Sequence, residues 1–284
     1  MKKLLVTGGT GFLGSRICSF YKERFEIIAP GHREMDITEE NDVRRFLHET
    51  CPDIVIHCAA VSDVGACEKD PERSYRINVI GTENLARISR EIGAKCILCS
   101  SDQVYFGSTL REPHKEEEVL NPANHYGRQK LYAEQSCLAI NPESVHLRLS
   151  WMYDRAAFSE TEHGDFLRTL LVKLDEKQKI SYPVYDVRGI TDVWEVIGNL
   201  EKVWELPGGV YHFGSPNDAS TYDTTVKLFE RLGLDLQLVE PNEEAFCDHP
   251  RNLSMSQAKI NSYGIYFSHT LEGLYRAMNG RKGD

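Results

Sequence analysis

The sequence contains no apolar run long enough to span a bilayer. Charged residues or glycines interrupt the 284-residue chain every few positions, whereas a transmembrane helix needs roughly 18 or more uninterrupted apolar residues. Residues 1–3 carry the positive charge of an export signal, but the apolar run that follows ends at Val6. We therefore expect a cytoplasmic protein that does not associate with membranes.

An excess of positive charge is also missing. The chain has 33 Lys and Arg against 43 Asp and Glu, which gives a formal net charge of −10 at pH 7. A surface with this charge repels nucleic-acid backbones and anionic lipids, so neither is an expected partner. Hydrophobic residues make up 41% of the chain, and this content can fill the core of one large α/β domain or two smaller ones.

The spacing of cysteines and histidines does not match a metal site. Most of the eight cysteines lie in segments with the apolar pattern of a strand or helix, which is typical of reduced, buried thiols. Cys96 and Cys99 form the one closely spaced pair. They share a predicted strand, where residues three apart point to opposite faces. The sequence therefore predicts free thiols and no metal.

Short apolar runs alternate with longer segments of helical periodicity. The runs lie at residues 3–6, 26–29, 53–57, 95–99 and 145–149, and the helical patterns at 12–25, 39–50, 70–92 and 124–139. This alternation predicts an α/β fold with a Rossmann-like, doubly wound parallel sheet. After Trp151 the rhythm loosens, which predicts a smaller C-terminal region. We expect a first domain at residues 1–152, to which residues 180–213 return, and a second region at residues 153–179 and 214–284.

A glycine-rich turn follows the first predicted strand. Gly9, Gly11 and Gly14 have the spacing G-x-G-x-x-G where the strand gives way to a helix. Such glycines permit a tight turn and let the backbone approach a pyrophosphate bound at the helix N-terminus. The sequence thus predicts a dinucleotide site with contacts from Gly8, Thr10, Gly11, Phe12, Leu13 and Gly14.

The second predicted strand ends without a carboxylate. NAD-specific sites commonly place Asp or Glu there to bind the ribose 2′-hydroxyl, but this chain continues with His32 and Arg33. Guanidinium pairs with phosphate through two charge-assisted hydrogen bonds, so Arg33 favours NADP(H). Glu34 is near enough to keep NAD(H) open, and Arg33 could equally be a surface charge. Asp36 and Ile37 could contact the adenine.

Tyr126 and Lys130 are four residues apart near the start of a predicted helix, so both side chains project from one face. A phenol with an ordinary pKa of about 10 becomes an acid/base near neutrality when a neighbouring cation favours its phenolate. Lys130 is placed to lower the pKa of Tyr126 in this way. A hydroxyl-rich strand end precedes them at Ser100 and Ser101, of which only one can face the site.

These motifs together resemble those of the extended short-chain dehydrogenases/reductases, and within them the dTDP-4-dehydrorhamnose reductase branch. The resemblance covers nearly the whole chain. It includes the glycine-rich turn, the helix around Asn78, the strand end at residues 100–105, the Tyr126 and Lys130 motif, and residues 148–153. The resemblance also places a strand end against the cofactor at Cys58, Ala59 and Ala60.

The resemblance implies a reduction in which the nicotinamide supplies a hydride and Tyr126 a proton. Ser101 would bind the substrate carbonyl oxygen. Lys130 would bind the nicotinamide ribose and lower the pKa of Tyr126, and Asn78 would complete a proton path through water. Further substrate contacts would come from Asp102, Trp151, Arg251 and Asn252.

The sugar pocket departs from the branch pattern at several positions. Gln103 stands where the branch has an aromatic residue, and His249 where it has Arg, although Arg251 could supply that charge. Trp151 follows the fifth predicted strand at the carboxyl end of the sheet, where ligands bind in such folds. A large aromatic residue there could equally fill the core.

We expect an NADP-preferring reductase of a nucleotide-linked 4-keto-deoxysugar, with dTDP-4-dehydro-L-rhamnose to dTDP-L-rhamnose as the leading reaction. Two alternatives stay open: a nucleotide-sugar epimerase that retains NAD, and a noncatalytic NADP-binding regulatory subunit. A dehydratase is disfavoured because the strand end lacks the Glu that would take a proton from carbon. Apolar helix faces at residues 83–92 and 126–137 suggest a homodimer, although they could also pack within one chain.

Overall fold

A computed structural model describes residues 1–158 and 164–280. The chain divides into two compact units. Unit 1 comprises Met1–Val104, Leu120–Arg148 and Ile197–Tyr211, and unit 2 comprises Tyr105–Val119, Leu149–Val196 and the chain from His212 onwards. Among the described residues, no helix combines the length and the apolar character needed to cross a bilayer.

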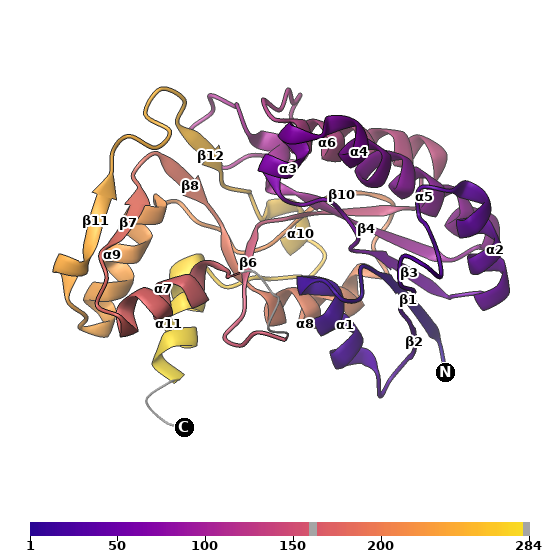
Figure 1. The fold of residues 1–284 in the computed structure, drawn as a ribbon, viewed down its shortest axis with the longest axis horizontal. Helices are drawn as coiled ribbons and strands as arrows, with labels where there is room; N and C mark the ends of the chain where they lie inside the picture. The colour runs from indigo at the N-terminus through magenta and orange to yellow at the C-terminus, as the bar shows by residue number, and fades with distance from the viewer. Residues whose placement is uncertain (159–163, 281–284) are drawn as a thin grey trace. The chain divides into compact units, whose positions relative to one another are not determined.

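Unit 1 is built on a six-stranded parallel sheet with the order β10-β5-β4-β3-β1-β2 (Figure 1). The strands β1, β3, β4 and β5 are largely buried, whereas the edge strand β2 is half-buried or exposed, and burial on both faces is typical of the inner strands of parallel sheets. The expected Rossmann-like sheet is therefore confirmed. The strands are β1 (Lys3–Thr7), β2 (Glu26–Ile28), β3 (Ile54–His57), β4 (Lys95–Ser101), β5 (Val145–Leu149) and β10 (Gly209–Phe213).

Helices cover both faces of this sheet (Figure 1). On one face, apolar residues of α2 (Glu40–Thr50) and α5 (Gly81–Ile92) pack against β1 and β3, and α6 (His125–Ile140) packs beside α5 against β4. The apolar faces that suggested a homodimer thus lie largely inside the chain. On the other face, the Tyr21 hydroxyl at the end of α1 (Phe12–Tyr21) donates a hydrogen bond of 2.9 Å to the Ile197 carbonyl.

The helix expected over residues 70–92 is interrupted. It consists of α4 (Pro71–Tyr75), a π-helical turn (Arg76–Ile80) and α5. In a π-helical turn the backbone hydrogen bonds join residues five apart instead of four, and such turns are frequent at functional sites. This one carries the fully buried Asn78. A short helix that the sequence did not indicate, α3 (Val64–Lys69), precedes it.

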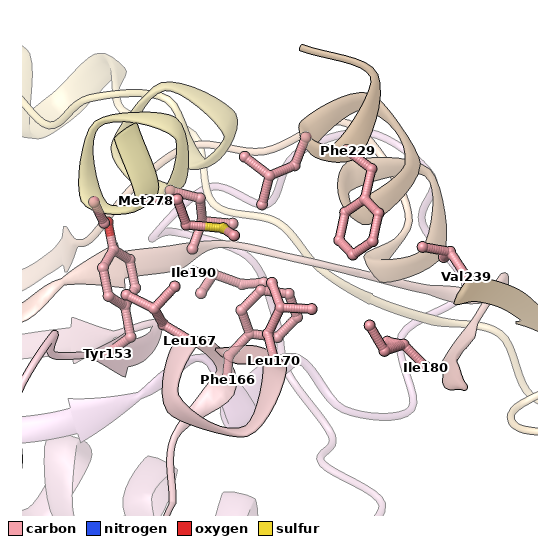
Figure 2. Packing of buried hydrophobic residues seen from close by; sticks show 12 residues of the cluster. Tyr153, Phe166, Leu167, Leu170, Ile180, Ile190, Phe229, Val239 and Met278 are labelled. Atoms are coloured by element: carbon pink, nitrogen blue, oxygen red, sulfur yellow. The ribbon is translucent and has the colours of Figure 1, made fainter. Parts of the chain in front are cut away.

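Unit 2 contains three pairs of short parallel strands. They are β6 (Trp151–Tyr153) with β9 (Ile190–Asp192), β7 (Ile180–Pro183) with β11 (Val239–Asn242), and β8 (Asp186–Arg188) with β12 (Arg251–Leu253). Its helices include α7 (Phe166–Asp175), α9 (Thr221–Leu232), α10 (Ala258–Asn261) and α11 (Thr270–Asn279). Figure 2 shows its core, where Tyr153, Phe166, Ile190 and Phe229 are all buried. The helix α8 (Val193–Val203) contributes residues to both units.

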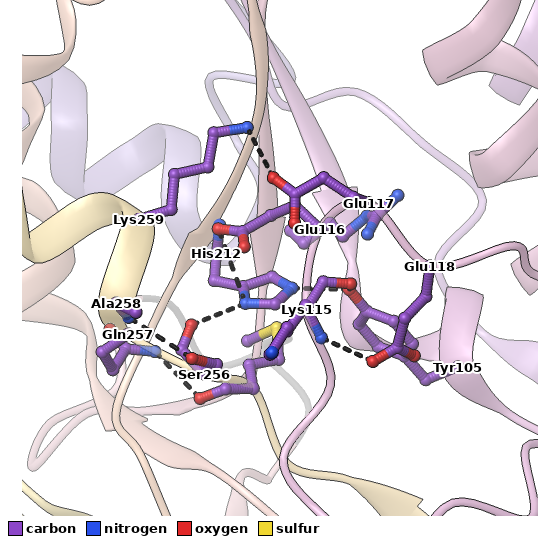
Figure 3. Close-up of polar contacts among 12 residues, drawn as sticks. Tyr105, Lys115, Glu116, Glu117, Glu118, His212, Ser256, Gln257, Ala258 and Lys259 are labelled. Atoms are coloured by element: carbon purple, nitrogen blue, oxygen red, sulfur yellow. Dashed lines mark hydrogen bonds and ion pairs between the residues drawn. The ribbon is translucent and has the colours of Figure 1, made fainter.

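The division of the chain differs from the expected one in two longer segments, and residues 149–152 and 212–213 also belong to unit 2. Residues 180–196 belong to unit 2 because β7, β8 and β9 pair with other strands of that unit. Residues 105–119 belong there as well. Figure 3 shows one reason: the Tyr105 hydroxyl lies 2.5 Å from Nε2 of His212, whose Nδ1 lies 2.7 Å from the Ser256 carbonyl oxygen.

Candidate active site

The glycine-rich turn brings the backbone of β1 against the end of β3. Gly8 has a φ of +67°, and a Cβ there would lie 2.8 Å from the Ala59 nitrogen. A Cβ on Gly14 would collide with the Gly8 carbonyl oxygen. No acidic residue occupies the first turn of α1, so its free N–H groups favour an anion. The turn therefore has the space and polarity for a pyrophosphate.

A cleft of about 840 Å³ lies over this turn within unit 1. Nine of the expected cofactor residues line it, whereas Phe12, Leu13, Gly14, Arg33 and Lys130 do not. Leu13 and Gly14 are instead buried where α1 begins. The nine lining residues are Gly8, Thr10, Gly11, His32, Asp36, Ile37, Cys58, Ala59 and Ala60.

The cations along the cleft are not all where the sequence placed them. Arg33 is exposed and does not line the cleft, while Arg73 of α4 and Arg76 of the π-helical turn do. Arg76 lies 3.2 Å from the Glu39 carboxylate. Glu34, the carboxylate that kept NAD open, accepts a 2.7 Å hydrogen bond from the Gly31 nitrogen. Helical residues 73 and 76 gave no signal in the sequence because charged residues commonly face solvent.

His57 links the glycine-rich turn to α5. Its Nδ1 lies 2.7 Å from the Thr7 hydroxyl and its Nε2 lies 3.1 Å from the Thr82 hydroxyl, which donates to the Asn78 carbonyl. Because Thr82 uses its proton on that carbonyl, Nε2 of His57 is the donor and Nδ1 the acceptor. Burial, with a smaller contribution from the Lys130 charge, lowers the pKa of His57 to about 3. The ring is therefore neutral.

The Asn78 side chain binds the loop that follows β3. Its Oδ1 accepts from the Val61 nitrogen at 2.8 Å, and its Nδ2 donates to the Val61 carbonyl at 3.0 Å and to Oε1 of Gln129 at 2.9 Å. Gln129 in turn donates to the Ser74 hydroxyl at 2.8 Å. Asn78 and Gln129 thus tie the cleft wall to α6. The sequence analysis did not single out Gln129.

The two serines at the end of β4 face different environments. Ser100 donates to the buried Glu134 carboxylate, which also accepts hydrogen bonds of 3.0 and 2.7 Å from Arg148. Ser101 lies 3.3 Å from Oδ1 of Asp102 and accepts a 3.2 Å hydrogen bond from the Gln103 nitrogen. Of the two, Ser101 lies close enough to Tyr126 to influence the pKa of its phenol.

Tyr126 and Lys130 are both buried on the inner face of α6. The Lys130 ammonium lies 5.8 Å from the centre of the Tyr126 ring and donates to the Cys99 carbonyl at 2.8 Å. We expected Lys130 to lower the pKa of Tyr126. Burial instead raises the pKa of this phenol well above its ordinary value, although the nearby Ser101 side chain works in the opposite direction. Burial also lowers the pKa of Lys130.

The start of α6 fixes where these two side chains lie. Asn124 caps the helix, with Oδ1 accepting from the Gly127 nitrogen at 2.6 Å and Nδ2 donating to the Gln103 side chain at 3.2 Å. A Cβ on Gly127 would collide with the Gln103 carbonyl oxygen. Close approach of α6 to the end of β4 therefore requires glycine at this position.

The other expected substrate residues belong to unit 2. Trp151 is half-buried, 5.5 Å from Phe166 between ring centroids, and the Arg188 guanidinium lies 4.9 Å from its ring. Arg251 makes a bidentate pair of 2.7 and 2.6 Å with Asp186. Asn252 donates to the carbonyl oxygens of Leu110 and Glu112. Arg251 and Asn252 therefore already have partners within unit 2.

No cluster of three or more potential metal ligands occurs in the part of the chain that the structure describes. A glycine-rich turn on a six-stranded parallel sheet, with Ser, Tyr and Lys near the sheet's carboxyl end, defines the extended short-chain dehydrogenase/reductase class. Within it, residues 1–279 match the family model described as RmlD substrate binding domain. The chain belongs to this family.

Individual relatives carry different names. The chain is 30% identical over 244 residues to a dTDP-4-dehydrorhamnose reductase of Mycolicibacterium smegmatis, covering 84% of this chain and 72% of that protein. It is 31% identical over 287 residues to methionine adenosyltransferase 2 subunit beta of Xenopus laevis, covering 93% and 83%. A crystal structure of a Bacillus anthracis dTDP-4-dehydrorhamnose reductase in complex with NADP superposes with a TM-score of 0.86, at 26% identity and 99% coverage of both chains.

Proposed function

We propose that the protein is an NADP-preferring reductase of a nucleotide-linked 4-keto-deoxysugar, with dTDP-4-dehydro-L-rhamnose as the leading substrate. The observation that carries this proposal is the placement of Ser101, Tyr126 and Lys130 in the same unit as a cleft suited to a dinucleotide. The reductase names of relatives and the NADP complex of a structural neighbour support it.

The cleft residues fit a bound dinucleotide. The cradle around Gly8 and Gly14 would be filled by a Cβ at either position, and the first turn of α1 offers free N–H groups to the pyrophosphate. Bound NADPH would supply a hydride to the substrate carbonyl carbon. In this proposal Asp36 and Ile37 lie beside the adenine, and Ala59 and Ala60 border the dinucleotide further along the cleft.

Tyr126 is proposed as the proton donor. Because burial raises the pKa of its phenol, the group holds its proton near neutrality and can give it to the developing alkoxide. The Ser101 hydroxyl would donate a hydrogen bond to the same oxygen. Lys130 would stabilise the phenolate that remains and contact the nicotinamide ribose, and the assignment of a water-linked proton path to Asn78 stays a prediction.

The first experiment measures NADPH oxidation with freshly prepared dTDP-4-dehydrorhamnose, with NADH as the comparison. Tyr126→Phe should reduce kcat by about 10²–10⁴-fold, the usual contribution of a general acid, while NADPH binding persists. Tyr132→Phe is the matched control because Tyr132 lies on the same helix but is 50% exposed, and it should retain wild-type turnover. Turnover in Tyr126→Phe equal to that of the parent would contradict the proposal.

A noncatalytic regulatory subunit is the second candidate, favoured by the likeness to methionine adenosyltransferase 2 subunit beta. It predicts NADP(H) binding without turnover of any keto-sugar. The epimerase alternative predicts tightly retained NAD and no net cofactor oxidation. The same assay, combined with analysis of the cofactor that copurifies with the protein, separates these two from the reductase.

A further inference from the structure

Cys58 and Cys99 face each other across neighbouring strands of the unit 1 sheet. His57 of β3 is in register with Leu98 of β4, so the next residues along, Cys58 and Cys99, are also opposite one another. Their Sγ atoms are 3.8 Å apart. Both residues are partly exposed, and Cys58 lines the cofactor cleft. They are 41 positions apart in sequence, so spacing along the chain gave no sign of the pair.

The backbone geometry permits a bond between the two sulfurs. Opposite residues on neighbouring strands have Cα atoms about 4.8 Å apart, and disulfides form at Cα separations of roughly 4.4–6.8 Å. The remaining cysteines of unit 1 are placed differently: Cys96 and Cys137 are buried together on the face covered by α5 and α6, Cys67 is buried in α3, and Cys51 is exposed at the end of α2. Two cysteines are nearby competitors: Cys18 lies close enough to influence the Cys58 thiol, and Cys67 lies close enough to influence Lys130.

The surroundings make the two thiols unequal. The pKa of Cys99 is lowered by its hydrogen bond with the Cys58 thiol, in which either sulfur can be the donor, and by the nearby Lys130 ammonium. The pKa of Cys58 is raised by the same hydrogen bond and by burial. Cys99 is thus the better thiolate, and Cys58 is its resolving partner.

We propose that Cys58 and Cys99 form a reversible disulfide in the wall of the cleft, and that this disulfide weakens dinucleotide binding. The oxidant is a peroxide. The Cys99 thiolate attacks one oxygen of hydrogen peroxide, the O–O bond breaks, and the released hydroxide takes a proton to leave as water. The Cys58 sulfur then displaces hydroxide from the Cys99 sulfenic acid, forming the S–S bond and a second water. An added dithiol reduces the bond again.

The cofactor turn is the structural link to binding. A Cβ on Gly8 would lie 2.8 Å from the Ala59 nitrogen and 3.0 Å from the Cys58 carbonyl carbon. The two backbones therefore touch at the position where the pyrophosphate is proposed to bind. Closing the Sγ–Sγ distance from 3.8 Å to about 2.05 Å shifts the Cys58 side chain in the cleft wall, next to the backbone that supports Gly8.

The first test maps disulfides in the full-length protein without using the proposed substrate. Purified protein is treated with hydrogen peroxide, remaining thiols are alkylated, and proteolytic peptides are identified by mass spectrometry. We expect linked peptides containing Cys58 and Cys99 that dithiothreitol separates, and slower linkage when NADPH is present. The matched control, Cys51→Ser/Cys247→Ser, removes the two exposed thiols and should form the same link, whereas Cys99→Ser should not.

Separate alkylation of Cys58 and Cys99 after peroxide treatment, or a link from Cys58 to Cys18, would overturn the pairing. If Cys99→Ser does not fold, as judged by its thermal unfolding, Cys58→Ala serves as the second variant. The disulfides identified in the wild-type protein decide the pairing whether or not these variants fold.

The second test titrates NADPH by fluorescence into reduced and oxidised protein. We expect oxidation to raise Kd by about tenfold or more, and dithiothreitol to restore it. An unchanged Kd in protein that carries the mapped disulfide would overturn the effect on binding. Because neither test requires turnover, a failure here is distinct from a failure of the proposed reductase activity.

Discussion

At the residue scale, Ser100 and Ser101 show how neighbouring hydroxyls acquire different roles. Alternation along β4 predicts that only one can face the site, but sequence alone does not say which. The buried Glu134 and Arg148 pair settles the direction of Ser100, because a buried carboxylate needs every donor within reach. Ser101 is left on the side of Tyr126. The long-range partners that decide this are 34 and 48 positions from Ser100, outside any local pattern.

This difference predicts opposite outcomes for two alanine variants. Ser101→Ala should lower kcat by about 10²–10³-fold, the usual cost of losing one donor to a developing oxyanion, with little change in Tm. Ser100→Ala should instead lower the free energy of unfolding by about 1–3 kcal/mol, because the buried Glu134 loses a donor. Steady-state kinetics and urea denaturation of both variants check the prediction. Equal kinetic losses in the two variants would contradict it.

Two buried histidines predict a loss of stability in mild acid. Burial lowers the pKa of both His57 and His146 to about 3, from the ordinary value of 6.5. Between these values the unfolded chain binds protons that the folded chain does not, so the free energy of unfolding falls as pH falls from 6.5 towards 3. The expected slope is about 1.4 kcal/mol per pH unit for each histidine.

The slope is measured by urea denaturation between pH 7 and about 5, a range above the ordinary pKa of Asp and Glu. His146→Gln is the informative variant because His146 lies in β5 and contacts Ser144 at 3.0 Å, away from the cofactor turn. In this variant the free energy of unfolding should change with pH by about 1.4 kcal/mol less per pH unit, which corresponds to one proton. A variant slope identical to that of the parent would show that His146 is not the group responsible.

At the scale of elements, the start of α6 is the feature on which the site geometry depends most. Tyr126 and Lys130 take their positions from the Asn124 cap and from the contact of Gly127 with residue 103. The sequence predicted the helix and its inner face from spacing alone. It could not predict the close contact, because the partner carbonyl belongs to a different segment of the chain.

Gly127→Ala should therefore reduce both stability and turnover. The added methyl group would push α6 away from the end of β4, at a cost of about 1–3 kcal/mol, and would shift Tyr126 relative to Ser101. Gly198→Ala is the matched control, since Gly198 lies in α8 and a Cβ there meets no heavy atom within 4 Å. That variant should keep its activity and gain up to about 1 kcal/mol from helix propensity. Thermal unfolding and kcat are the two measurements, and a Gly127→Ala variant as active as Gly198→Ala would refute the role of this contact.

The interrupted helix at residues 71–92 is a feature that apolar periodicity in the sequence does not predict. Apolar spacing correctly indicates helix on both sides, but a single inserted residue in the π-helical turn changes which side chains point inward. Asn78 is buried there and holds Val61 and Gln129. Its hydrogen bonds are long-range, so the local pattern contains no trace of them.

At the scale of the whole molecule, the sequence predicted the sheet and its crossover helices more completely than the division into units. Strands in a parallel sheet are strongly apolar and follow one another regularly, so they are recognisable one at a time. Residues 105–119 and 180–196 join unit 2 through pairings such as β8 with β12 and the Tyr105 contact with His212. Those pairings depend on segments more than 60 residues away, which no local pattern encodes.

The proposed preference for NADPH would be a property of the whole cleft, and it is best tested by the stability of the folded chain. A ligand that binds only the folded state raises the free energy of unfolding by RT ln(1 + [L]/Kd), about 2.7 kcal/mol at 100 Kd. At equal concentration NADPH should therefore raise Tm more than NADH does.

The sequence assigns this preference to Arg33, whereas the arginines that line the cleft are Arg73 and Arg76. Thermal-shift titrations of Arg33→Ala, Arg73→Ala and Arg76→Ala decide between them: the residue that binds the 2′-phosphate is the one whose loss removes the extra shift with NADPH but leaves the shift with NADH. We expect Arg33→Ala to have this effect, because the exposed Arg33 follows His32, which lines the cleft. Loss of the preference only in Arg73→Ala or only in Arg76→Ala would assign binding of the 2′-phosphate to that arginine instead. Equal Tm shifts with both cofactors in the parent would contradict NADP preference altogether.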